Sequence, residues 1–358
     1  METVDSLTKE YLKTKFLEYY SKNEVEEVRA LNEREWAFVE VEALPDFIMR
    51  RHIAFDSYIE LRGFILKNVP LHIYYSSAYY EKPDAENMEA KGWKRADLIF
   101  DIDADHLPNG SLKEAKRQIK TLYDILEDDF GCKDMEIVFS GSRGYHLHVH
   151  DDDFLELGSA ERREIVDYLL LTDFKFSREL PESRQTLRIA EIMAKKIYEA
   201  AKSGKVREVF PNVSPKREKM LTASAEEVFE RVKRLDFSDF PKSLDRALSK
   251  LFNEALEKVK VQVDPPVTAD VKRLIRLPGS LHGKTGLRVC KIERDEIDDF
   301  KPTRDAVVFG DEDVKIRVKN NVKLRLKEEE FRLKKGKAKV PEFVAIYLIC
   351  RGVAIYGW

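Results

Sequence analysis

The sequence predicts an α/β (α+β) fold, in which a mixed or antiparallel sheet forms the core and a helical subdomain interrupts it. Two apolar strand patterns end in polar loops, at residues 97–105 and 135–150. Helical periodicity then dominates residues 152–258, and strand patterns return afterwards. We therefore expect residues 1–151 and 259–358 to build the core, with residues 152–258 inserted as a helical subdomain.

The first expected element is an amphipathic helix that carries Leu7, Tyr11, Leu12 and Phe16 on one face. The residues before it lack the apolar run of a signal peptide. The apolar window 343–358 is short and is interrupted by an arginine, so we expect a core element there and no membrane span. Three cysteines far apart in the sequence fit a reducing compartment, and we expect a cytoplasmic protein.

The segment 97–105 reads as an apolar strand that breaks into carboxylates. Successive side chains of a strand point to opposite faces, so Asp101 and Asp103 should project together while Phe100 and Ile102 pack on the other side. Two adjacent acids repel each other unless a cation lies between them. Mg²⁺ or Mn²⁺ bridging to a substrate phosphate is the usual solution, and a solvated acidic loop is the alternative.

A helix should follow this segment. Ser111 and Glu114 match a capping box at its start, and an apolar stripe continues from there. The stripe consists of Leu112, Ala115, Ile119 and Leu122.

The second polar segment, 135–150, is a strand, a tight turn with two glycines, and another strand. Such a turn offers backbone N–H groups beside the hydroxyl of Ser140 and the planar guanidinium of Arg143, which suits phosphate oxygens. His146, His148 and His150 should share one face of the second strand. An ordinary hairpin with solvated histidines is the alternative.

Helices are expected over 183–201, 223–235 and 242–259, and none of them carries a candidate catalytic cluster. Strands should resume at Val261 and carry Asp264 back to the first acids. The stretch 273–287 is rich in glycine and proline, and its basic side chains could converge on an anion or simply be solvated. These side chains include Arg276, His282 and Lys284.

Basic residues alternate with apolar ones over 314–327, which predicts a hairpin with its turn at Asn320 and Asn321 and a basic outer face. A second basic run, 332–339, is expected to be a loop. The formal net charge of the chain is −3, so binding to nucleic acid would depend on local basic stripes such as this one.

Three motifs together resemble those of the archaeo-eukaryotic primase superfamily, and in particular the small, catalytic subunit of archaeal DNA primase. They are Asp-Ile-Asp at 101–103, Ser-Gly-Ser-Arg-Gly-Tyr-His-Leu-His-Val at 140–149, and Asp-Pro-Pro at 264–266 followed by Arg-Leu-Pro-Gly-Ser-Leu-His-Gly-Lys-Thr-Gly-Leu at 276–287. The resemblance spans most of the chain, and it implies the primase-type catalytic core as the fold.

The resemblance implies DNA-templated synthesis of RNA or DNA primers for replication. A 3′-hydroxyl would attack the α-phosphate of a nucleoside triphosphate and release pyrophosphate. Asp101, Asp103 and Asp264 would hold two Mg²⁺ or Mn²⁺ ions, an arrangement that suits phosphoryl transfer. The residues expected to bind the nucleotide are Ser140, Arg143, His146, Arg276, His282 and Lys284.

The implied partners are a single-stranded DNA template, nucleoside triphosphates and a large primase subunit in a heterodimer, with no membrane. The family commonly carries a Cys/His zinc module after the first motif. Here residues 105–111 lead directly into a helix, and Cys132, Cys290 and Cys350 are far apart with no CxxC pair. We therefore expect no structural zinc with ordinary ligand spacing.

Three other interpretations remain. A metal-dependent hydrolase could use His146, His148 and His150 with the two acids of the first motif as transition-metal ligands. A catalytically silent relative would only bind nucleic acid or a partner, although all three acids are present. A repair or end-joining polymerase of the same superfamily would usually be a stand-alone module or part of a ligase fusion. The primase hypothesis accounts for the most residues.

Overall fold

A computed structural model describes residues 5–107, 110–172 and 174–357 of the chain. The expected loop at 105–111 and the two ends of the expected core therefore lie partly outside the described residues. Contacts divide the chain into two compact units, Met1–Val166 with Val263–Trp358, and Asp167–Gln262.

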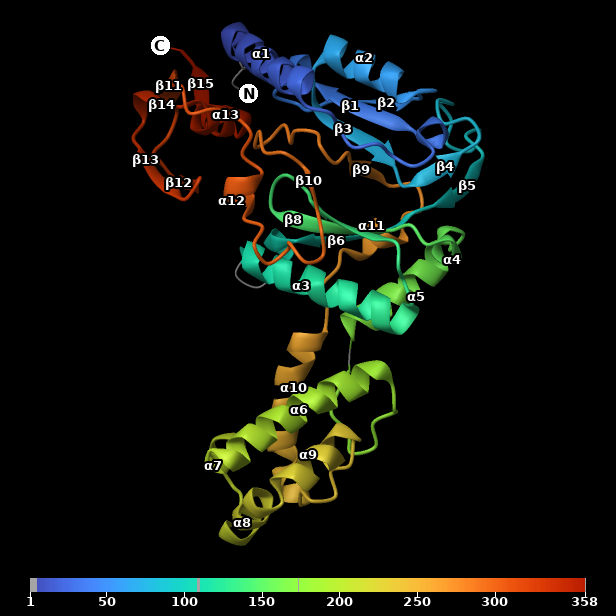
Figure 1. Cartoon of the computed structure of the whole chain (residues 1–358), viewed down its shortest axis with the longest axis vertical. Coiled ribbons are helices and arrows are strands. Elements are labelled where there is room, and N and C mark those ends of the chain that lie inside the picture. Colours follow the sequence, from blue (N-terminus) through green and yellow to red (C-terminus); the bar gives the residue numbers. More distant parts are fainter. Residues whose placement is uncertain (1–4, 108–109, 173, 358) are drawn as a thin grey trace. The chain divides into compact units, whose positions relative to one another are not determined.

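The first sheet of the larger unit has the strand order β2-β1-β3-β9, and its strands pair antiparallel. Helices α1 and α2 cover its outer face, where Trp36, Phe38, Leu61 and Ile65 belong to one buried apolar cluster (Figure 1). The elements are α1 (Ser6–Lys22), β1 (Trp36–Glu40), β2 (Met49–Ile53), α2 (Tyr58–Asn68), β3 (Pro70–Ser76) and β9 (Leu274–Arg276).

The second sheet has the order β10-β7-β8-β6 and is also antiparallel. Helix α3 packs on β8 and β6, on the side away from the first sheet (Figure 1). Ser111 caps α3 by accepting a hydrogen bond from the Glu114 N–H, which is half of the expected capping box. The Glu114 carboxylate instead accepts hydrogen bonds from Arg117 and Gln118. The elements are β6 (Leu98–Asp103), α3 (Leu112–Ile125), β7 (Met135–Phe139), β8 (Gly144–Val149) and β10 (Cys290–Ile292). These sheets confirm the predicted α/β class.

Further elements accompany the two sheets. They are η1 (Leu31–Glu33), η2 (Val41–Ala43), β4 (Ala78–Tyr80) paired with β5 (Trp93–Ala96), η3 (Ala104–His106), η5 (Leu126–Phe130), α4 (Asp152–Leu155), α5 (Ser159–Leu170), α11 (Pro265–Ala269) and α12 (Pro302–Asp305).

The expected hairpin over 314–327 is wrong. Strand β11 pairs with β14 and β15, whereas β12 pairs with β13. The two residues between β12 and β13, Lys327 and Glu328, both have positive φ, as a type I′ turn requires. The turn pairs β12 with β13, which follows it in the sequence, and not with β11. Most of the expected loop at 332–339 therefore lies in two strands, β13 and β14. These strands are β11 (Asp313–Val318), β12 (Val322–Leu326), β13 (Glu329–Leu333), β14 (Gly336–Pro341) and β15 (Ala354–Tyr356).

The apolar C-terminal window forms α13 (Glu342–Cys350), which is buried over nearly its whole length, in agreement with the expected core element. Within the described residues, no helix has the length and apolar character needed to cross a membrane.

The smaller unit is helical and has its own apolar core, which includes Met193, Val232 and Phe252. Its elements are α6 (Arg184–Lys202), α7 (Val206–Val209), α8 (Pro215–Ala223), α9 (Ala225–Lys233), η6 (Lys242–Leu244) and α10 (Asp245–Val259). The boundary expected at residue 152 differs from the contact boundary, which falls within α5. Arg162 explains this difference, because its buried guanidinium donates to the carbonyls of Ala96 and Asp97 in the larger unit.

Candidate active site

The first two acids lie on β6, beside β8. Asp101 pairs in register with His146, and Asp103 pairs with Gly144. Phe100 and Ile102 are fully buried on the opposite face, so the predicted alternation is confirmed. Gly144 permits this register, because a Cβ atom there would lie 2.8 Å from the Ile102 carbonyl oxygen.

Asp264 reaches the same place by a different route from the one expected. It precedes α11 as the N-cap residue and does not lie on a strand, because Pro265 and Pro266 favour the first turn of a helix and cannot donate to a sheet. The Asp264 backbone N–H donates to the Asp101 carbonyl at 2.9 Å. This bond joins the third acid to the strand that carries the first two.

Electrostatics at Asp101 favour a cation. Burial, with the negative charges of Asp103 and Asp264, raises the pKa of Asp101 to about 6, while Arg276 and Arg273 oppose this rise. Carboxylate oxygens are the donors that Mg²⁺ and Mn²⁺ prefer, and a divalent cation would relieve the repulsion among these three acids, so the residue types fit such an ion.

The turn between β7 and β8 places the basic residue of the second motif. The Ser140 N–H donates to the Gly144 carbonyl at 3.0 Å and closes the turn. Arg143 Nη1 lies 2.6 Å from Asp105 Oδ1, and the two side chains are 48% and 51% exposed. Asp105 had no predicted role. The sequence did contain a signal for this residue, because Asp105 continues the spacing of two residues between Asp101 and Asp103.

The loop of the third motif packs directly on that turn. Thr285 Oγ1 donates to the Gly141 carbonyl at 2.6 Å and lies 3.3 Å from His282 Nδ1. Gly141 has φ +84°, and a Cβ atom there would lie 2.6 Å from the His282 Cβ. The second and third motifs therefore contact each other only because residue 141 has no side chain.

The histidines of the site are neutral. Burial and the nearby charge of Arg276 lower the pKa of His146 to about 3 and hold the pKa of His282 well below its usual range. His146 Nε2 lies 3.6 Å from Asp101 Oδ1. His72, which had no predicted role, stacks edge-on against His282 at 4.9 Å between ring centroids.

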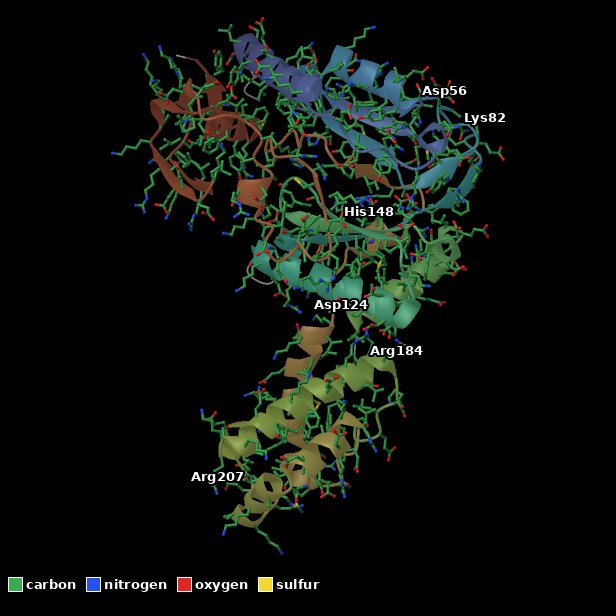
Figure 2. The ribbon with its side chains drawn as sticks, viewed as in Figure 1. Asp56, Lys82, Asp124, His148, Arg184 and Arg207 are labelled. Atoms are coloured by element: carbon green, nitrogen blue, oxygen red, sulfur yellow. The ribbon has the colours of Figure 1, made fainter. Side chains whose placement is uncertain are left out.

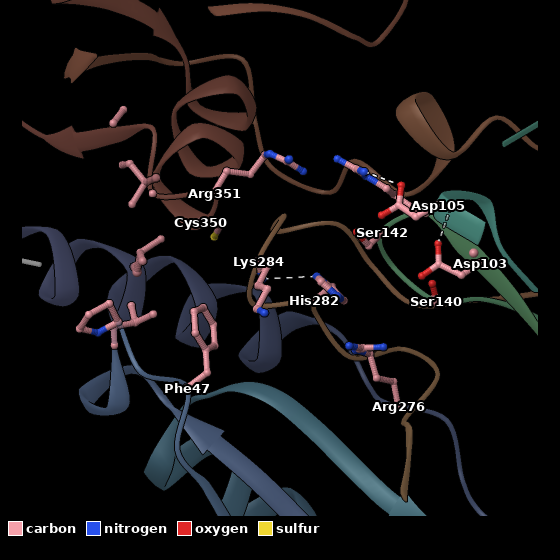
Figure 3. Close-up of a pocket in the computed structure, with 18 of the residues that line it drawn as sticks. Phe47, Asp103, Asp105, Ser140, Ser142, Arg276, His282, Lys284, Cys350 and Arg351 are labelled. Carbon is pink, nitrogen blue, oxygen red and sulfur yellow. Dashed lines mark hydrogen bonds and ion pairs between the residues drawn. The ribbon is translucent and has the colours of Figure 1, made fainter. Parts of the chain in front are cut away.

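A cavity of about 590 Å³ connects these groups (Figure 3). Every predicted site residue except Asp264 lines it. Lys284 lies over the Phe47 ring, with Nζ 5.0 Å from the ring centroid, and Arg276 lies over Tyr74. Lys319, from the predicted basic stripe, also lines the cavity, as do residues without a predicted role, among them Thr8, Phe47, Asp105, Ser142 and Arg351. Phe47 and Arg351 come from distant elements, and no local pattern marks them.

The cavity thus has two kinds of wall. Carboxylates from β6 lie at one side, and Arg143, Arg276 and Lys284 supply cations around it. An anionic ligand bound with divalent cations, such as a nucleoside triphosphate, matches both walls.

The other two histidines of the second motif segment, His148 on β8 and His150 directly after it, do not line this cavity. His148 is fully buried, and His150 lies between Asp97 and Glu136. Although burial opposes the charged form, the contacts with those two carboxylates raise the pKa of His150 to about 9. Among the described side chains, His148 and His150 group with Glu136 and not with the acids of the first motif. This arrangement argues against the hydrolase interpretation.

Comparison with known proteins decides the family. The family model of the DNA primase small subunit matches residues 100–293. The DNA primase small subunit PriS of Archaeoglobus fulgidus is 49% identical, over 98% of this chain and 99% of that protein. The PriS protein of Methanococcoides burtonii is 36% identical, over 99% of this chain and 100% of that protein. The chain belongs to the family of DNA primase small subunits.

Members of this small-subunit family are DNA-directed nucleotidyltransferases, and this chain is accordingly an enzyme of primer synthesis for DNA replication. A solved structure, the polymerase domain of Mycobacterium tuberculosis ligase D in complex with DNA, aligns over 84% of this chain and 88% of its own. Its sequence identity is 13% and its TM-score 0.42.

Proposed function

We propose that this primase small subunit extends a 3′-hydroxyl by two-metal nucleotidyl transfer, with Asp101, Asp103 and Asp264 as the metal ligands. One observation supports the proposal: the start of α11 is hydrogen-bonded to β6, and the charges of Asp103 and Asp264 act on Asp101 beside a cavity with basic walls. Mg²⁺ or Mn²⁺ bound there would activate the attacking oxygen and neutralise charge on the leaving pyrophosphate.

The remaining residues position the nucleotide. Arg143 offers a planar guanidinium and Lys284 a point charge to phosphate oxygens, while Arg276 faces the same cavity. Ser140 and the two neutral imidazoles of His146 and His282 can donate hydrogen bonds without adding charge. Fixed groups of this kind stabilise the charge that develops on the transferred phosphoryl group.

The proposal includes the partners that the family implies. The template is single-stranded DNA, the substrates are nucleoside triphosphates, and a large primase subunit completes a heterodimer that works in the cytoplasm. The relatives' name, small subunit, supports the existence of such a partner.

The test is primer synthesis on unprimed single-stranded DNA with the large subunit supplied, using NTPs or dNTPs and Mg²⁺ or Mn²⁺. We expect Asp101→Asn to abolish the product without lowering the melting temperature, because the substitution removes a buried charge that its neighbours repel.

The matched control is Asp56→Asn, which alters an exposed carboxylate (labelled in Figure 2) that does not line the cavity. Synthesis by Asp101→Asn at the level of this control would overturn the assignment of the metal ligands.

A further inference from the structure

A second group of potential metal ligands lies at the other end of β8. Glu136 on β7 and His148 on β8 are direct register partners, and His150 follows two residues later on the same face. One ligand atom of each residue lies within 4.8 Å of the others. The strands thus place two imidazoles and one carboxylate around a single point.

His148 is the unusual member. Its side chain is 0% exposed, and neither ring nitrogen has a hydrogen-bond partner among the described residues. A buried imidazole without any partner is costly, and each such case needs an explanation. A metal ion at one ring nitrogen would provide it.

The neighbouring groups support ligation by the other two residues. Lys291 Nζ pairs with Glu136 Oε1 at 2.6 Å, while Glu136 Oε2 lies 3.7 Å from His150 Nε2. On the far side of the ring, His150 Nδ1 lies 3.1 Å from Asp97 Oδ1. A carboxylate behind a histidine, on the nitrogen away from the metal, is the usual support of a ligating imidazole.

That supporting carboxylate is itself held firmly. Asp97 is 0% exposed, accepts a hydrogen bond from the Tyr79 hydroxyl at 2.8 Å, and pairs with Arg34 at 2.7 Å. The orientation of the His150 ring is therefore set by groups that cannot reorganise towards solvent.

There is also room for a fourth ligand. Glu136 and His150, though not His148, line a small cavity of about 50 Å³, whose wall also contains Arg29, Arg34 and Lys291. One water molecule needs about 10–15 Å³ of such space, so a water bound to the ion from the side of Glu136 and His150 fits.

We propose that Glu136, His148 and His150 form a mononuclear Zn²⁺ site, with Asp97 as the group that orients His150 and water as the fourth ligand. Two imidazoles and one carboxylate match the ligand preference of Zn²⁺, which binds them at roughly 2.0–2.2 Å. The ligand atoms lie within 4.8 Å of one another, and side-chain rotation has to bring them closer, to about 3.3–3.6 Å, for all three to bind one tetrahedral ion. The site joins β7 to β8 and lies apart from the three catalytic acids, so it does not depend on the proposed function.

The experiment measures Zn²⁺ binding to the full-length chain by competition with a chromophoric chelator, and repeats it with Co²⁺, whose tetrahedral complexes absorb visible light strongly. We expect one Zn²⁺ per chain and visible cobalt bands. Glu136→Gln should weaken the binding at least about 10-fold and remove the bands, since it replaces a charged ligand with an amide.

Two controls separate this site from its surroundings. Asp134→Asn changes a carboxylate that neighbours Glu136 in sequence but pairs with Arg29, and it should retain the wild-type affinity. Asp101→Asn should also retain one Zn²⁺, which distinguishes the site from the catalytic acids.

Circular dichroism checks that each variant folds, and His150→Gln replaces Glu136→Gln if the latter does not. Equal Zn²⁺ affinity of the wild type and the folded ligand variant would overturn the proposal. Absence of binding to the wild type would do so as well, and would make the cluster a charge network in which protonated His150 bridges Asp97 and Glu136.

Discussion

The acidic and basic side chains at the cavity interact with one another, but they do not cancel one another's charge. Asp101 is held among other acids, while Arg276 and Arg273 partly offset the repulsion. Arg143 instead has an exposed partner in Asp105, so its charge is available when a stronger anion arrives. Exposed pairs of this kind contribute little to stability, typically about 0–1 kcal/mol.

Arg143→Ala should therefore affect the substrate more than the fold. We expect the KM for the nucleotide to rise by about 10-fold to 100-fold, because a charge-assisted hydrogen bond to phosphate contributes about 1.5–3 kcal/mol. Steady-state kinetics at saturating template measure it. Arg207→Ala, which breaks an exposed ion pair in the helical unit (Figure 2), is the control and should leave KM unchanged. An unchanged KM in Arg143→Ala would place the triphosphate elsewhere.

Arg34→Leu should act on stability, because Arg34 and Asp97 are both 0% exposed and lie 2.7 Å apart. Removing one partner leaves a buried charge unpaired, which costs about 3–5 kcal/mol of unfolding free energy. Urea denaturation measures the loss. Arg294→Leu breaks an exposed pair with Asp124 and should cost at most about 1 kcal/mol. Similar losses in the two variants would contradict the argument.

At the scale of elements, close backbone approaches decide how the motifs meet. The turn before β8 and the loop at 279–287 touch at Gly141, and β6 meets β8 at Gly144. A side chain at either place would separate segments that the proposed chemistry requires together.

Gly141→Ala is expected to raise the KM for the nucleotide and to lower stability by more than a positive φ alone explains. The added Cβ would lie 2.6 Å from His282 and push the loop that carries Lys284. Gly131→Ala is the matched control, since Gly131 also has positive φ (+74°) but nothing within 4 Å of the added atom. It should lose only about 1 kcal/mol and retain its KM. Equal effects of the two variants on KM and stability would show that the close approach of Gly141 to His282 affects neither.

The same scale explains the incorrect hairpin. Alternating basic and apolar residues identified strands over 314–327, and both strands exist as β11 and β12. Their partners could not be predicted, because the pairing depends on positive φ at Lys327 and Glu328, residue types that rarely adopt it.

On the scale of the whole molecule, two units have separate apolar cores. The helical unit Asp167–Gln262 buries Met193, Val232 and Phe252 among its own helices. A core of this size in about 100 residues is typical of an independently folding domain.

We therefore expect a fragment of residues 167–262 to fold alone. Circular dichroism should show a helical spectrum and a cooperative thermal transition. Phe252→Asp in the same fragment is the control and should abolish the transition, because it buries an unpaired charge. A wild-type fragment without helical signal would mean that the unit needs the rest of the chain.

The sequence by itself determined the α/β class, the strand that carries Asp101 and Asp103, and the helical stretch between the second and third motifs. These features follow from local periodicity and from short motifs, which hold their information within a few neighbouring residues. The residues of the second and third motifs were also readable, since the glycines and charges that mark them are adjacent in the chain.

Only the tertiary structure decided how those segments meet. Asp264 reaches Asp101 through a helix cap and a backbone hydrogen bond, and no periodicity encodes that contact. The pairing of Glu136 with His148 depends on the register between β7 and β8. The contact of His150 with Asp97 depends in addition on the register between β8 and β6, which Asp97 directly precedes. Contacts between distant residues arise from the summed packing of the whole unit, so they become visible only after the chain has folded.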